Sequence, residues 1–221
     1  HATIRRQRQM CIRDRDLDVF VFGGDGDAFS IGGNHFNHCA RKNVNLTYVV
    51  MDNNVYGLTK KQTSPTSPIG FKSKTDMWGA VDKPINPMQQ AISAGATFVA
   101  RSTHTNPKHL LSMMEAAMDH KGFAFIECLS ECTEFYDGAF DSSNPRKGGE
   151  FKEVPEDHDP TDENAAYALA EELVPGHFGI YYQIDRPSKQ DIEAKINAKF
   201  LEKTKGMEDW EILQQNFDKM R

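Results

Sequence analysis

The sequence predicts an α/β fold, with a parallel β-sheet flanked by helices and a mostly helical C-terminal extension. Short apolar runs alternate with helix-like segments over residues 17–130, which is the pattern of a parallel sheet. The run at residues 45–52 is continuously apolar in its centre, as strands buried on both faces are. After Cys132 the alternation ends, and the chain becomes turn-rich and acidic.

The first elements are a strand, a glycine-rich turn and a helix. Residues 17–23, LDVFVFG, are apolar and end in glycine, which predicts a buried strand. A Gly–Asp loop at residues 24–27 follows, then a helix over residues 29–42 and a second strand over residues 45–52. We expect residues 53–67 to form a polar loop and residues 72–83 to be irregular.

The alternation then continues with a helix over residues 87–95, a strand over 96–102, a helix over 107–121 and a strand over 123–130. Pro107 and Gly122 stand at the two ends of the third helix, where proline and glycine are favoured. In the extension we expect a helix over residues 161–174 capped by Thr161. An edge strand over 179–184 and amphipathic helices over 188–203 and 207–220 complete the prediction.

The chain divides into three expected parts. Residues 6–15, RQRQMCIRDR, show no apolar period and resemble a translated sequencing adapter. We therefore predict non-native sequence at 1–15, an α/β domain at 16–132 that is incomplete at its N-terminus, and an acidic extension at 133–221. A basic nucleic-acid arm at the N-terminus is the alternative.

Charge and cysteine content limit the function classes. Residues 133–221 hold 20 acidic side chains against 11 Lys and Arg, which disfavours a nucleic-acid partner. No apolar run approaches the roughly 20 residues of a membrane span, so we expect no membrane partner. Four scattered cysteines and the missing signal peptide predict a cytoplasmic protein.

Two polar turns follow neighbouring predicted strands. Asp25 lies between Gly24 and Gly26 after the first strand, and the second strand ends in Asp52 and Asn53. Ligands of open α/β sheets bind at the carboxyl ends of the strands. Because Mg²⁺ binds about six oxygens from carboxylates, amides and phosphates, the two turns could hold a diphosphate through the metal. The alternatives are that these are ordinary turn residues and that Asp27 only caps the next helix.

The spacing of these turns resembles a known signature. The triplet at residues 24–26, followed 26 residues later by Asn53-Asn54, is similar to the thiamine diphosphate motif. The longer text GDGDAFSIGGNHFNHCARKNVNLTYVVMDNNVYGLTKKQTSPTSP resembles the β subunit of 2-oxoacid:ferredoxin oxidoreductases, and a looser likeness continues to about residue 155. The resemblance implies the thiamine diphosphate-binding fold. It also implies oxidative decarboxylation of a 2-oxoacid to acyl-CoA, with electrons passed to ferredoxin.

The resemblance also assigns residues. By position, the Mg²⁺ ligands would be Asp25, the Asn53 side chain and the Val55 carbonyl. The residues lining the diphosphate would be Gly24, Gly26, Asp27, Gly57, Leu58 and Thr59. Lys61 departs from the family, which often has glycine there. The resemblance assigns no catalytic side chain, and Asn54 is left open between a ligand and a turn residue.

Cys132 matches the last of four cysteine ligands of the family's [4Fe–4S] cluster. The other three belong to an N-terminal third that we expect to be missing, so the isolated chain should lack the cluster and be inactive. An α subunit, ferredoxin, a 2-oxoacid and coenzyme A are the implied partners. The alternatives are another thiamine diphosphate enzyme of the non-oxidative decarboxylase type, or a non-catalytic α/β nucleotide-binding module.

The remaining candidate residues are expected to be structural. Cys39 and Cys128 are predicted to pack in the core, and His35 and His38 to lie on the surface. Phe178, Tyr181 and Tyr182 are predicted to pack within a strand.

Overall fold

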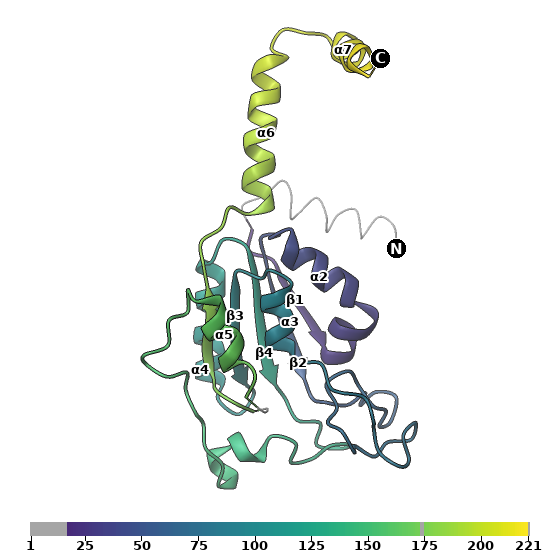
Figure 1. The fold of residues 1–221 in the computed structure, drawn as a ribbon, viewed down its shortest axis with the longest axis vertical. Coiled ribbons are helices and arrows are strands. Elements are labelled where there is room, and N and C mark those ends of the chain that lie inside the picture. The colour runs from purple at the N-terminus through teal and green to yellow at the C-terminus, as the bar shows by residue number, and fades with distance from the viewer. Residues whose placement is uncertain (1–16, 173–174, 221) are drawn as a thin grey trace.

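A five-stranded sheet lies at the centre of the molecule (Figure 1), in a computed structural model that describes residues 17–172 and 175–220. The strands are β1 (Phe20–Gly24), β2 (Leu46–Asp52), β3 (Phe98–Thr103), β4 (Phe123–Leu129) and β5 (Gly179–Gln183). Their spatial order is β1-β2-β4-β3-β5. The first four strands are parallel, which confirms the predicted fold class, and β5 pairs antiparallel with β3 at one edge.

Helices cover both faces of the sheet. They are α2 (Gly33–Arg41), α3 (Pro87–Ser93), α4 (Pro107–Asp119), α5 (Glu163–Leu169), α6 (Lys189–Lys203) and α7 (Asp209–Lys219), with short turns η1 (Asp27–Ile31), η2 (Asp141–Ser143) and η3 (Pro145–Lys147). Residues of α2, α3 and α5 pack on one face of the sheet, and α4 packs on the other. None of the described helices is long and apolar enough to cross a bilayer. The prediction for residues 1–15 lies outside the described residues.

The central strands β3 and β4 are buried along their whole length. Continuous apolar sequence predicted this, because such strands face helices on both sides. Each strand nevertheless carries one buried charged residue, Arg101 in β3 and Glu127 in β4, and these two are paired in the sheet register. Cys128 is fully buried beside them and Cys39 packs against the other core cluster, as predicted.

The turn after β1 differs from the predicted loop. Helical backbone begins directly at Asp25, and a π-helical turn, η1, precedes α2. The N–H of Gly32 donates to the Asp27 carbonyl at 2.8 Å. A Cβ on Gly32 would lie 2.2 Å from that oxygen, so the wide turn requires glycine there. The π-helical turn depends on this close approach of Gly32 to the Asp27 carbonyl. The spacing of apolar residues along a helix does not predict such a contact.

The extension after residue 132 also differs in detail. Asp162, not Thr161, caps α5, because its carboxylate accepts from the N–H groups of Asn164 and Ala165. The Thr161 hydroxyl instead donates to Asp159. Helices α6 and α7 were both predicted, and α6 begins with a capping box between Ser188 and Asp191. Figure 1 shows α6 extending away from the end of the sheet opposite the arrowheads of the parallel strands, with α7 beyond it.

Candidate functional site at the carboxyl ends of β1 and β2

Two carboxyl groups lie close together where β1 and β2 end. Asp25 is 3% exposed and Asp52 is 1% exposed. The Thr66 hydroxyl oxygen lies 2.8 Å from an oxygen of each, so one hydroxyl connects the two carboxyl groups. The segment that carries Thr66 belongs to the loops below the arrowheads of the strands in Figure 1.

Burial governs the protonation of this pair. It raises the pKa of Asp25, although hydrogen bonds from the Ser64 and Thr66 side chains and from the N–H of Asn53 act in the opposite direction. Burial also raises the pKa of Asp52 well above its ordinary value, and the charges of Asp25 and Glu127 add to the rise. Two adjacent buried carboxyl groups disfavour ionisation unless a cation is present. The pair therefore suits a site that holds a divalent ion.

The turn after β2 places oxygen donors beside Asp25. Gly24 pairs with Met51 in the sheet register, and the Thr66 hydroxyl lies 2.8 Å from oxygens of both Asp25 and Asp52. The turn that begins at Asn53 therefore starts beside the turn that carries Asp25. The Asn53 side-chain oxygen accepts from the N–H of Val55 at 3.1 Å, which keeps the amide oriented within the turn. A carboxylate, an amide oxygen and a backbone carbonyl are hard oxygen donors, the class that Mg²⁺ prefers. The structure thus places the turns that carry Asp25 and Asn53 side by side, and the assignment of Asp25, Asn53 and Val55 as metal ligands stays a prediction.

Asn54 has a structural role in the same turn. Its backbone has a positive φ of 55°, a conformation that asparagine tolerates better than most residues. Its side-chain amide donates to Asp52 at 3.1 Å and to the Thr66 carbonyl at 3.0 Å. Asn54 therefore ties the strand end to the segment that carries Thr66.

The residues predicted to line the diphosphate lie on two adjoining turns. A Cβ on Gly26 would be 2.0 Å from the Tyr56 ring, so the turn after β1 packs directly on the turn after β2. The second turn is closed by Tyr56 and Gln62, whose backbones pair, and its tip exposes Leu58 completely. Only the backbone of such a tip residue is suited to an anionic ligand.

Asp27 and Thr59 make local contacts. The Asp27 carboxylate accepts from the Gly24 N–H at 3.1 Å. The alternative that Asp27 only caps the next helix is wrong, because Asp27 is the first residue of η1 and neither η1 nor α2 has a side-chain cap. The Thr59 hydroxyl donates to the Tyr56 carbonyl at 3.3 Å. Their assignment to the diphosphate stays a prediction.

Cys132 adjoins this site. A Cβ on Gly57 would lie 3.2 Å from the Cys132 sulfur, so the thiol is in contact with the predicted diphosphate loop. Within residues 17–172 and 175–220, no group of three His, Cys, Asp or Glu side chains is arranged to hold a metal. A four-thiolate cluster on Cys132 would take its other three ligands from outside the described residues.

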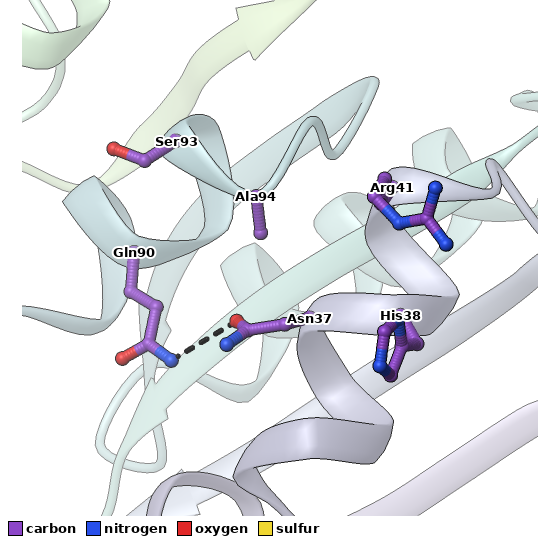
Figure 2. A pocket seen from close by; sticks show the side chains of 6 residues that line it. All are labelled: Asn37, His38, Arg41, Gln90, Ser93 and Ala94. Carbon is purple, nitrogen blue, oxygen red and sulfur yellow. Dashed lines mark hydrogen bonds between the residues drawn. The ribbon is translucent and has the colours of Figure 1, made fainter.

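Two of the cavities in the described part of the chain bear on the site assignment. One of about 400 Å³ adjoins the site and is lined by hydroxyl and carboxylate side chains, including Ser64, Thr63 and Asp76. The other, of about 440 Å³, lies between α2 and α3 (Figure 2). Asn37 and Gln90 are hydrogen-bonded across it at 3.1 Å. The second cavity contains none of the predicted cofactor residues.

Lys61 introduces backbone strain beside the site. It has a φ of 70°, in the left-handed region that costs most residues about 1–2 kcal/mol and glycine little. We predict that Lys61→Gly stabilises the fold by about 0.5–1 kcal/mol. This net value allows for the greater conformational entropy that glycine gives the unfolded chain, which opposes the relief of strain. Urea unfolding of the complete β subunit measures this change. Lys61→Ala is the matched control, since it removes the same side chain and keeps the positive φ. A glycine variant whose free energy of unfolding is no higher than that of the alanine variant would contradict the prediction.

The sequence did not identify three polar residues of this region. Thr66 and Ser64 lie in a segment predicted only as a polar loop, and the density of hydroxyls in TSPTSP was the available signal. Glu127 gave no signal, because a single acidic residue in an apolar strand has no periodic pattern.

Comparisons with known proteins agree with the fold. Residues 9–128 match the family described as thiamine pyrophosphate enzyme, C-terminal TPP binding domain. The chain is 44% identical over 133 residues to 2-oxoglutarate oxidoreductase subunit KorB of Mycobacterium tuberculosis, covering 60% of this chain and 36% of that protein. It is 46% identical over 121 residues to the 2-oxoacid:ferredoxin oxidoreductase subunit beta of Saccharolobus solfataricus, covering 55% and 40%. The chain thus spans less than half the length of these relatives.

A solved structure gives the same result in three dimensions. The 2-oxoglutarate:ferredoxin oxidoreductase from Magnetococcus marinus, with 2-oxoglutarate, coenzyme A and succinyl-CoA bound, matches with a TM-score of 0.82 and 38% identity. The match covers 94% of this chain and 70% of that one. The chain therefore belongs to the thiamine pyrophosphate enzyme family, and its relatives there are β subunits of 2-oxoacid:ferredoxin oxidoreductases.

Proposed function

We propose that this chain is part of the β subunit of a 2-oxoacid:ferredoxin oxidoreductase and binds thiamine diphosphate through Mg²⁺. The net reaction converts a 2-oxoacid anion, coenzyme A and two oxidised ferredoxins into acyl-CoA, CO₂, two reduced ferredoxins and one proton. The packing of the Asp25 turn against the Asn53 turn carries the proposal, because it puts hard oxygen donors where α/β sheets bind ligands. The names of the relatives supply the reaction class.

The residues of this chain would hold the cofactor and its metal. Asp25, the Asn53 amide oxygen and the Val55 carbonyl would bind Mg²⁺. The backbones of residues 24–27 and 57–59 would adjoin the diphosphate. When bound, thiamine diphosphate supplies a carbon nucleophile and an electron sink for decarboxylation. The chain's contribution is to fix the diphosphate end and to exclude water from the buried carboxylate.

Cys132 would be one of four thiolate ligands of a [4Fe–4S] cluster. Its contact with Gly57 would place that cluster beside the diphosphate loop, a suitable position for one-electron transfer. An α subunit would complete the enzyme. The cytoplasmic location, and the absence of nucleic-acid and membrane partners, stay predictions from the sequence.

The proposal is tested with the complete β subunit co-purified with its α subunit. With 2-oxoglutarate or pyruvate, coenzyme A, Mg²⁺ and thiamine diphosphate, we expect acyl-CoA by mass spectrometry and two electrons per acyl-CoA delivered to methyl viologen. Omission of coenzyme A should stop turnover. Free aldehyde formed without an acceptor would instead indicate a non-oxidative decarboxylase. No dependence on thiamine diphosphate would indicate a non-catalytic module.

A further inference from the structure

A cavity rich in lysine lies beside Cys132. It has a volume of about 560 Å³ and is lined by Lys60, Lys61, Lys72, Ser73, Lys74, Met77 and Phe135. We call this set the lysine pocket. The N–H of Lys74 donates to the Lys61 carbonyl at 3.1 Å, which holds the two lysine segments side by side. Four lysine side chains thus line one opening, and the ammonium of Lys61 lies 5.4 Å from the centre of the Phe71 ring.

The lysine pocket shares a wall with the cysteine. Phe135, which lines it, lies in the turn that Cys132 begins, since its N–H donates to the Cys132 carbonyl at 3.3 Å. Cys132 and Phe135 both pack against one small apolar cluster built on Val55, Phe71 and Ala80. Phe135 therefore belongs both to the lining of the lysine pocket and to the cluster against which Cys132 packs.

The charge of this region contrasts with that of the chain. The chain has a formal net charge of −6, yet residues 55–83 hold five lysines against two aspartates. In the part of the chain that the structure describes, none of the salt bridges involves a lysine of the pocket. Met77 and Trp78, at the pocket and next to it, are 71% and 93% exposed. Apolar side chains beside unpaired lysines are a suitable surface for a protein with an acidic face.

Resting on the proposed function, we propose that the lysine pocket is the docking surface for the acidic electron-carrier protein, the ferredoxin of the net reaction. Each docking event would pass one electron from the enzyme to one oxidised carrier, and two events would complete each 2-oxoacid oxidation. Carboxylates around the carrier's own redox centre would meet the lysines. Charge complementarity of this kind raises the association rate by roughly 10–1,000-fold at low salt and permits rapid release.

The test uses the complete α and β enzyme with Lys72→Glu/Lys74→Glu, both of them exposed lysines outside the metal and diphosphate residues. Lys108→Glu/Lys121→Glu, on and just after α4, is the matched control, since it makes the same charge change on exposed lysines elsewhere. Ferredoxin is varied at 20 to 300 mM NaCl with the 2-oxoacid and coenzyme A saturating. Methyl viologen replaces ferredoxin in a parallel assay.

We expect kcat/KM for ferredoxin to fall about tenfold or more at low salt in the pocket variant, and its salt dependence to weaken. The methyl viologen rate should stay at or above that of the wild type, and the control should behave as wild type. Unchanged ferredoxin kinetics, or an equal fall in the control, would overturn the proposal. A raised KM for coenzyme A would assign the pocket to that anion instead, and loss of the α subunit would assign it to the subunit interface. Wild-type enzyme that fails to reduce methyl viologen would contradict the proposed function itself.

Discussion

Asp25→Asn is expected to lower the affinity of the complete enzyme for Mg²⁺ and thiamine diphosphate by at least about 100-fold, equivalent to about 2.7 kcal/mol. The substitution replaces a charged metal ligand by a neutral amide of the same shape. An amide oxygen can still accept from Thr66, which lies 2.8 Å from the present carboxylate, so the fold should persist. Isothermal titration of cofactor at fixed Mg²⁺, with circular dichroism as a folding check, measures the change.

The pH dependence of stability provides a second readout of the same variant. Burial raises the pKa of Asp25 above 3.8 in the folded state. A carboxyl group with a raised pKa contributes stability at low pH that is lost as the pH rises through the folded value. Without cofactor, Asp25→Asn should therefore be at least as stable as wild type at pH 7. Asp119→Asn, on the exposed surface of α4, is the control and should change neither property. Unaltered cofactor affinity in Asp25→Asn would contradict the assignment.

Removing one partner of the buried Arg101–Glu127 pair is expected to destabilise the fold by about 3–5 kcal/mol. The Arg101 Nε lies 2.5 Å from a Glu127 oxygen, and both side chains are at most 1% exposed. Burial opposes the charged form of Arg101, but the Glu127 carboxylate holds the pKa of the guanidinium above its ordinary value. Among the described residues, Glu127→Met would leave that cation with the Pro175 carbonyl and the Tyr181 hydroxyl as its hydrogen-bond acceptors.

A double variant separates the charge from the packing. Arg101→Met/Glu127→Met removes both charges and fills the space with apolar side chains, so it should be more stable than either single variant. Urea unfolding of all four proteins gives the coupling energy between the two sites. Single variants that unfold at the wild-type midpoint would show that the pair does not support the sheet.

Strands β2, β3 and β4 were predictable because their burial on both faces leaves continuous apolar runs. The prediction that the first strand is buried was wrong, because β1 lies at an edge of the sheet, where Val21 and Phe22 are 36% and 59% exposed. The antiparallel direction of β5 was not, since one short aromatic run fits either direction at an edge. Phe178 and Tyr181 are fully buried and Tyr182 is 5% exposed, as predicted. His35 and His38 are exposed on α2, also as predicted. Periodicity thus identified both the core and the solvent face.

The two turns of the site could be predicted from the sequence, but the hydrogen bonds that join them to the rest of the chain could not. Asp25 and Asn53 each follow a strand, so topology alone places them at one edge of the sheet. Thr66 joins this edge from a polar loop, by a hydrogen bond to a residue 41 positions earlier. No local pattern encodes such a contact. The sequence indicated the strain at Lys61 only indirectly, because the resembled family often has glycine at this position. The structure shows the cause of the strain, which is the positive φ of Lys61.

A crystal structure of the complete enzyme with Mn²⁺ and thiamine diphosphate would show whether Asp25 and Asn53 hold the metal. The anomalous signal of Mn²⁺ locates the metal independently of the protein density. We expect one peak about 2.1–2.2 Å from both an Asp25 oxygen and the Asn53 amide oxygen, with diphosphate oxygens on its far side. A metal peak bound to other residues, or a diphosphate held with no metal beside Asp25, would contradict it.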